Sequence, residues 1–202
     1  MIMEIQNNKE EVPFSYYAEL YSKADKLEIA GRLGILAENG AFSVTLMGKT
    51  YAVTETAEIT DGQGIAPALP VQTFLLRYLL EGKSIPALGN WKTFREMPWG
   101  ELYMKPYTGR VLTRAAFTFG TRVDAFCRAA EKMGAATVNH GDAGYEFTLI
   151  DDYRIRLLVW AGDEEFPPSA QVLYSDNFEE GFAPEDRVVA GDILITAIKA
   201  NM

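Results

Sequence analysis

Apolar residues recur at helical spacing near the start of the chain. Residues 14–21 place two tyrosines, a phenylalanine and an alanine on one helical face, and we expect Pro13 to open this helix. The tetrapeptide SKAD at 22–25 has the form of a capping box. It predicts that a second helix starts there and ends at Gly34.

The pattern then changes from helical spacing to strict alternation. The segments AFSVTLM (41–47) and TYAVTE (50–55) alternate apolar and polar residues on either side of Gly48-Lys49. A two-residue loop with glycine in the first position is typical of a type II′ turn. These residues therefore predict a β-hairpin.

Helical spacing returns in the middle of the chain. Pro70 is expected to open a short helix, and a longer helix is expected over residues 100–117. Pro106 falls inside the longer helix, which predicts a kink or a break there. The tetrapeptide TRVD at 121–124 has the form of another capping box and predicts a third helix.

Alternation marks the last third of the chain. The segments GYEFTLI (144–150) and YRIRLLVW (153–160) flank a turn at residues 151–152, which predicts a second hairpin. A three-residue loop would set Glu146 opposite Arg156, a favourable cross-strand pair. We therefore expect one face of this hairpin to be apolar and the other to carry charge.

These elements predict an α+β fold, with a mixed or antiparallel sheet built from hairpins and packed with about five to six helices. A final helix is expected to begin at Pro184. We expect a single globular domain over residues 1–202, and its natural division is a helical and hairpin subdomain at 1–66 and a main body at 67–202.

Composition narrows the class of protein. Hydrophobic residues make up 48% of the chain and charged residues 23%, which is the balance of a soluble globular protein. No apolar run approaches the roughly 20 residues of a membrane span, and the first residues lack the pattern of a secretory signal. One cysteine cannot form an internal disulfide. We expect a cytoplasmic protein that does not bind membranes.

The net charge of −9 is unevenly distributed. Residues 141–202 hold thirteen acids and four bases, and the rest of the chain is neutral. An acidic excess repels polyanions, so we expect no nucleic acid as a partner.

The chain lacks the residues that several common kinds of active site and cofactor site require. The chain has one cysteine and one histidine, too few for an ordinary zinc site or an iron–sulfur cluster, and no phosphate-binding, dinucleotide-binding or serine-hydrolase motif occurs. The sequence therefore identifies no cofactor. Cys127 is expected to be a small buried residue, and His140 to be a surface loop residue, although Asp142 could orient it as a general base.

Two segments could carry a binding site, WKTFREMPWGELY (91–103) and WAGDEEFPPSAQVLYS (160–175). An arginine between aromatic residues suits a carboxylate or phosphate partner, and we expect Arg95 to meet the acids at 163–165. The candidate binding residues in the two segments are Trp91, Arg95, Glu96, Tyr103, Asp163, Glu164 and Glu165.

A divalent cation is the alternative ligand, because Mg²⁺ and Ca²⁺ take carboxylate oxygens. We expect no metal here, since consecutive carboxylates in an extended chain diverge. If a cation bound, its ligands would come from Asp163, Glu165, Asp142 and Asp176. This alternative would make the protein a metal-dependent hydrolase or transferase.

The same two segments resemble a known family. Trp91, Phe94-Arg95-Glu96, Gly100 and Tyr103, followed by Gly162 to Pro167, Leu173 to Asp176 and Pro184 to Asp186, are similar to domain of unknown function 3786. The resemblance runs from about Phe14 to the end of the chain. It implies a bacterial or archaeal protein of unknown activity, typical of anaerobes.

Some members of that family carry an added cysteine-rich iron–sulfur domain, which implies redox or corrinoid-linked metabolism. This chain lacks the extra cysteines, so a cluster would have to come from a separate iron–sulfur protein. Our main hypothesis is a binding or accessory domain for a small-molecule ligand or a partner protein, and whether it is also an enzyme stays open.

Overall fold

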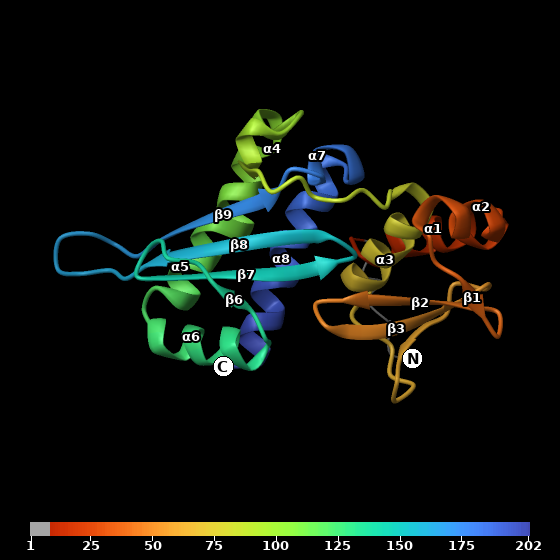
Figure 1. The fold of residues 1–202 in the computed structure, drawn as a ribbon, viewed down its shortest axis with the longest axis horizontal. Helices are drawn as coiled ribbons and strands as arrows, with labels where there is room; N and C mark the ends of the chain where they lie inside the picture. The colour runs from red at the N-terminus through yellow and green to blue at the C-terminus, as the bar shows by residue number, and fades with distance from the viewer. Residues whose placement is uncertain (1–8) are drawn as a thin grey trace, which may run out of the picture. The chain divides into compact units, whose positions relative to one another are not determined.

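The computed structural model describes residues 9–202, and the chain separates into two compact units. The first unit ends at Ser84, and the second comprises Ile85–Met202. Each unit combines helices with antiparallel strands (Figure 1). The fold class is therefore α+β, as predicted.

Three helices belong to the first unit. α1 (Glu11–Lys23) begins two residues before Pro13, and α3 (Leu69–Glu81) has its proline in the first turn and Gly82 at its C-terminal end, as expected. α1 and α3 pack against each other. Their contact explains why the first unit extends beyond residue 66.

The second helix, α2 (Lys26–Leu33), is capped by Asp25 rather than by Ser22. The Asp25 carboxylate accepts the N–H of Leu27 at 2.8 Å. The Ser22 hydroxyl instead donates to the carbonyl of Glu19 at 2.9 Å, within α1. The capping box predicted at 22–25 is therefore wrong, because a bond inside the preceding helix occupies the serine.

The strands of the first unit form an antiparallel sheet in the order β1-β2-β3-β4. They are β1 (Ala37–Glu38), β2 (Ala41–Leu46), β3 (Lys49–Thr54) and β4 (Ile59–Asp61). Leu46 pairs with Lys49, so Met47 and Gly48 form the two-residue loop, with φ values of 50° and 76°. Two positive φ values define a type I′ turn. The hairpin is confirmed, but the predicted loop position and turn type are wrong.

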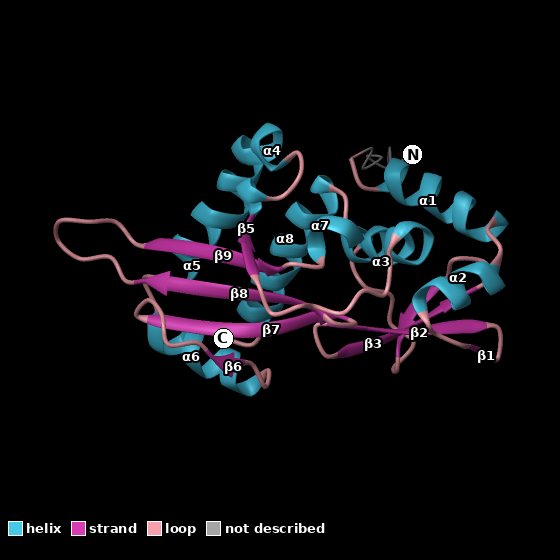
Figure 2. Ribbon diagram, turned by 45° about the horizontal axis from the view of Figure 1, so that its top comes forward, coloured by secondary structure: helices cyan, strands magenta, loops and turns pink. Residues whose placement is uncertain are grey.

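The strands of the second unit form an antiparallel sheet in the order β6-β7-β8-β9-β5. They are β5 (Trp91–Thr93), β6 (Ala136–Thr137), β7 (Ala143–Ile150), β8 (Tyr153–Trp160) and β9 (Ser169–Ser175). β5 comes first along the chain but lies at one edge of this sheet (Figure 2).

The β7–β8 hairpin has the predicted register. Glu146 lies opposite Arg156, and its carboxylate accepts a hydrogen bond from Nε at 3.0 Å and forms an ion pair with Nη2 at 2.9 Å. A register shift between Thr148 and Ile150 shortens the loop from the expected three residues to two. The cross-strand pair is confirmed, and the irregularity absorbs the difference in loop length.

Helices cover one face of this sheet (Figures 1 and 2). They are α4 (Gly100–Tyr107), α5 (Arg114–Phe119), α6 (Val123–Lys132), α7 (Phe178–Gly181) and α8 (Pro184–Ala200). α8 begins at Pro184, as predicted. Side chains on the covered face form the core, including Ile155, Leu157 and Val172, each no more than 2% exposed.

α4 and α5 are joined by a π-helical segment, Thr108–Thr113, without a break at Pro106. The proline removes the N–H that would bond the carbonyl of Leu102. Leu102 is exposed, so water can satisfy that carbonyl. The helix predicted over 100–117 is therefore confirmed, and of the two predicted effects of Pro106, a kink or a break, the break is wrong.

The N-terminus of α6 also differs from expectation. Arg122 is its N-cap residue, and no side chain caps the helix. The Thr121 hydroxyl donates to the carbonyl of Phe117 at 3.2 Å. As at Ser22, the hydroxyl bonds into the preceding helix, so the capping box predicted at 121–124 is wrong.

Candidate functional site

The candidate site is a hollow at the sheet edge where β5 ends. β5 pairs with β9 only over Leu173–Ser175, after which the chain turns into a 3₁₀ helix, Phe94–Glu96. The rest of the β9 edge borders a hollow of about 280 Å³. Its lining residues are mostly apolar and comprise Thr93, Phe94, Arg95, Met104, Tyr107, Leu112, Ala170, Gln171 and Val172.

Glu96, a predicted site residue, holds the turn that borders this hollow. Its carboxylate accepts the backbone N–H of Thr93 at 2.7 Å and the Thr93 hydroxyl at 2.8 Å. These two bonds lower the pKa of Glu96, the backbone bond most. The interaction is a capping box that fixes the start of the 3₁₀ helix. Glu96 therefore fixes the backbone that carries Arg95.

Arg95, the central predicted residue, is the one charged residue in the lining of the hollow. Its Nε lies 3.0 Å from a carboxylate oxygen of Glu101, and the two side chains are 65% and 74% exposed. The expected contact between Arg95 and the acids at 163–165 is wrong, because Arg95 pairs with Glu101 in the first turn of α4 instead.

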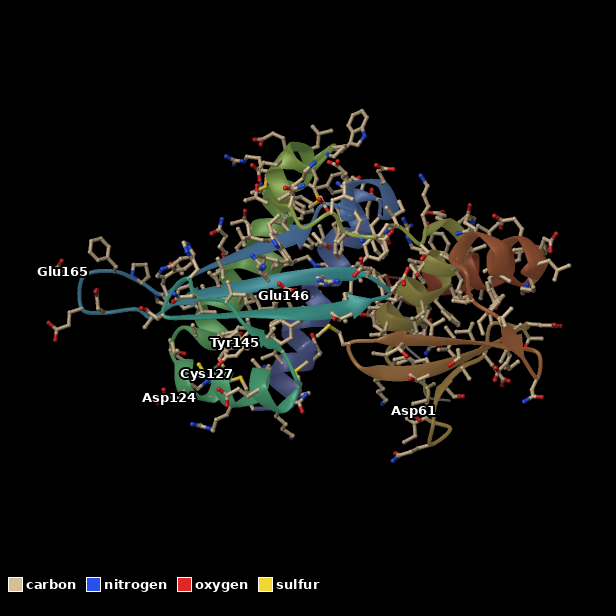
Figure 3. The ribbon with its side chains drawn as sticks, viewed as in Figure 1. Asp61, Asp124, Cys127, Tyr145, Glu146 and Glu165 are labelled. Atoms are coloured by element: carbon tan, nitrogen blue, oxygen red, sulfur yellow. The ribbon has the colours of Figure 1, made fainter. Side chains whose placement is uncertain are left out.

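The acids at 163–165 form a turn at the tip of the β8–β9 loop, and Figure 3 shows Glu165 at its far end. The Asp163 carboxylate accepts the N–H of Phe166 at 2.7 Å and of Glu165 at 2.8 Å, which lowers the pKa of Asp163. Asp163 thus closes its own turn. Glu164 is exposed beside it.

A second hollow, of about 340 Å³, lies between this loop and Gly120-Thr121. The acidic turn forms most of its wall, and residues 161–167 are all exposed. A wall made of one exposed loop buries little of a ligand. The hollow beside Arg95 is the better candidate, because strand and helix residues form its wall and three of them, Phe94, Tyr107 and Val172, are buried.

The carboxylates considered as metal ligands bind backbone amides. Asp142 accepts the N–H of Ala161 at 2.8 Å, and Asp176 accepts the N–H groups of Leu88 at 2.9 Å and Asn90 at 3.2 Å. Within residues 9–202, no group of three or more His, Cys, Asp or Glu side chains is arranged to hold a metal ion.

Trp91 lies on the sheet face that the helices leave open. The guanidinium of Arg156 stacks on its ring, and Arg156 in turn bonds Glu146, which Figure 3 shows on the strands in front of the helices. Arg154 adds a longer contact to Glu146, 3.7 Å between charged atoms. Trp91 is therefore held rigidly near one end of β5, and Thr93 separates it from the hollow.

Tyr103 lies on α4, and its hydroxyl bonds Glu185 at the start of α8. This hydrogen bond raises the pKa of Tyr103. The turn before α4 is equally constrained. Trp99 is 70% exposed with a φ of 63°, and a Cβ on Gly100 would lie 2.0 Å from the carbonyl oxygen of Phe94. Only glycine fits at position 100.

Arg187 was not found from the sequence. It is 2% exposed, its Nη1 donates to the carbonyl of Pro98 at 2.8 Å, and its Nη2 donates to the carbonyl of Glu179 at 3.0 Å. Burial lowers its pKa. Arg187 ties α8 to the turn before α4 and to α7. The available signal was a charged residue on the apolar side of the last helix.

The two residues set aside earlier remain outside this site. Cys127 is half-buried rather than buried, and Figure 3 shows it close to Tyr145 on the helical side of the sheet. The ring of His140 lies edge-on to Trp160, with centroids 5.9 Å apart. His140 is exposed on a loop, as expected.

No helix in the described part of the chain is long and apolar enough to cross a membrane. No curated protein and no solved structure matches this chain. A family match covers most of it, from residue 25 to residue 197, and includes both segments that border the hollow. On that match, the chain belongs to the family described as "Domain of unknown function (DUF3786)".

Proposed function

We propose that the protein is a binding module that takes a small, mainly apolar ligand with one carboxylate in the hollow beside Arg95. The observation that carries this proposal is the composition of the hollow, which combines apolar walls with one cationic residue and Gln171. Ligand pockets commonly have apolar walls and a few polar groups that fix orientation. A volume of about 280 Å³ suits a ligand smaller than most drugs.

The ion pair of Arg95 leaves its charge available. An exposed pair contributes only about 0–1 kcal/mol, because water screens both groups. Arg95 and Glu101 are each more than half exposed. A ligand carboxylate held against the apolar wall would be less screened by water than the carboxylate of Glu101. It can therefore replace Glu101 as the partner of Arg95 at little cost.

The test is a titration of the full chain with hexanoate. Binding is measured by calorimetry and by the NMR signal of the Met104 methyl group. We expect saturable binding that Arg95→Gln weakens by about tenfold, the loss of one charge-assisted hydrogen bond. Glu101→Gln should strengthen binding, because it removes the competing carboxylate.

Arg154→Gln is the matched control, since it removes an exposed arginine from the open face of the same sheet. It should leave hexanoate binding unchanged, and hexylamine should not bind at all. If Arg95→Gln and Arg154→Gln lower the affinity for hexanoate equally, the effect comes from net charge alone, and the proposed site is refuted.

The metabolic setting is proposed from the family resemblance alone. Redox or corrinoid-linked metabolism in an anaerobe is the setting it suggests, with a separate iron–sulfur protein as a partner. Copurification of such a protein with the wild-type chain, and its loss with Arg95→Gln, would support this setting.

A further inference from the structure

We propose that the hollow beside Arg95 receives the C-terminal end of a partner polypeptide, which joins β9 as a short additional strand. This inference rests on the proposed function, since it names the ligand of the same hollow. Strand addition at an open sheet edge is a recurring mode of peptide recognition.

The backbone of β9 offers hydrogen bonds toward the hollow. The N–H of Asp176 donates to the carbonyl of Asn90 at 3.1 Å, on the β5 side. Backbone groups in a strand alternate sides, so the N–H of Val172 and both groups of Ala170 point to this side as well. No other described strand pairs with β9 at residues 170–172 on this side.

The same alternation is visible across β8. The carbonyl of Val159 accepts the N–H of Asp142 at 3.0 Å, on the side of β8 away from β9. Val159 pairs with Ala170. The backbone groups of both residues therefore point away from each other, and those of Ala170 point toward the hollow.

The free edge is short and closed at one end. Three residues of extended chain span about 10 Å, and beyond Leu173 the edge is occupied by β5. A strand added here and running parallel to β9 must therefore stop near Arg95. A chain that stops there places its terminal carboxylate beside the one charged residue of the lining.

This alignment also determines which face of the sheet each side chain of the added strand would occupy. Residues opposite Ala170 and Val172 would direct their side chains to the helix side, toward Met104 and Leu112. The residue between them, opposite Gln171, would face the open side of the sheet. Its N–H would meet the carbonyl of Ala170, and its carbonyl would meet the N–H of Val172.

The probe that follows from this arrangement is N-acetyl-Leu-Ala-Leu with a free carboxylate. NMR titration of the ¹⁵N-labelled full chain should show binding about tenfold tighter than that of hexanoate, with large shifts of the Ala170 and Val172 amides. Methylation of the central alanine nitrogen should weaken binding about fivefold or more, the loss of one hydrogen bond. Amidation of the terminus should also weaken it.

Ala170→Pro removes the edge-facing N–H without removing a bond to β8, and proline is tolerated at strand edges. It should weaken binding of the tripeptide more than binding of hexanoate, because only the tripeptide accepts a hydrogen bond from this N–H. If the variant fails to fold, the N-methylated tripeptide still tests strand addition, because it leaves the protein unchanged.

Strand addition is refuted if the tripeptide binds no tighter than hexanoate, or if N-methylation does not change its affinity. In either case, binding of hexanoate would still support the proposed function. If neither compound binds, both proposals fail.

Discussion

The guanidinium of Arg156 lies 3.8 Å from the centre of the Trp91 ring, across the open face of the second unit. The two residues come from strands separated by β9, so the contact ties the edge strand to the middle of the sheet. This link is independent of backbone pairing, and its strength can be measured directly.

Arg156→Ala should lower the free energy of unfolding by about 1–2 kcal/mol, from the lost cation–π contact and the lost bonds to Glu146. The side chain of Arg156 is 29% exposed, which limits solvent screening. Arg154→Ala is the control, because the side chain of Arg154 is 44% exposed. This substitution should lower the free energy of unfolding by less than about 1 kcal/mol. Urea denaturation followed by circular dichroism measures both, and equal losses would contradict the expectation.

Gly100→Ala should destabilise the protein by about 2 kcal/mol or more, because the new methyl group would overlap the backbone carbonyl of Phe94. Gly109→Ala is the matched control in the following helical segment, where nothing lies within 4 Å of the added methyl group. There the substitution should raise stability by up to about 1 kcal/mol. Thermal unfolding of the two variants should show shifts of opposite sign.

Arg187→Met should cost about 3 kcal/mol, because it removes a buried guanidinium that donates to the carbonyls of both Pro98 and Glu179. Arg187→Lys should restore little of this, since one ammonium group cannot reach both carbonyls as a planar guanidinium does. Chemical denaturation is the measurement. Full rescue by lysine would mean that charge matters more than the paired hydrogen bonds.

Asp61 should make the protein less stable as the pH falls from about 4 to about 2. The Lys49 ammonium group, 2.7 Å away, and the backbone N–H groups of Ile65 and Gln63 lower the pKa of Asp61 to about 2. The unfolded chain protonates this carboxyl near pH 4. It therefore binds the extra proton over this range, and folding loses the contribution of the carboxylate.

The check is the slope of unfolding free energy against pH between 4 and 2, which should be shallower in Asp61→Asn. Glu58→Gln removes a nearby exposed carboxylate as the control. An identical slope in Asp61→Asn and wild type would show that other carboxyls dominate acid unfolding.

Local patterns predicted the local structure well. The alternation of residues 144–160 was enough to set Glu146 opposite Arg156, because register follows from which face is apolar. The caps at Ser22 and Thr121 failed for an equally local reason. Each hydroxyl had a carbonyl available in the preceding helical turn, and motif spacing does not weigh that competitor.

The candidate site was only partly predictable. The segment 91–103 was identified, and Arg95 does line the hollow. Its nearest carboxylate could not be chosen from the sequence, because Glu101 and the acids at 163–165 have the same charge and only the fold brings one of them close. For Arg187 the sequence shows a charge on the apolar side of the last helix but not its partners, because these are backbone carbonyls.

The π-helical segment between α4 and α5 changes how the apolar residues of this helix must be spaced. Tyr107, Val111, Ala115 and Phe119 are all buried and recur every fourth residue. On a regular α-helix that spacing rotates the stripe by about 40° at each step. The wider π-helical turns offset this drift and keep all four side chains buried. The segment thus acts as a one-residue insertion that the core now depends on, and deleting a residue from it would turn half of the helix away from the core.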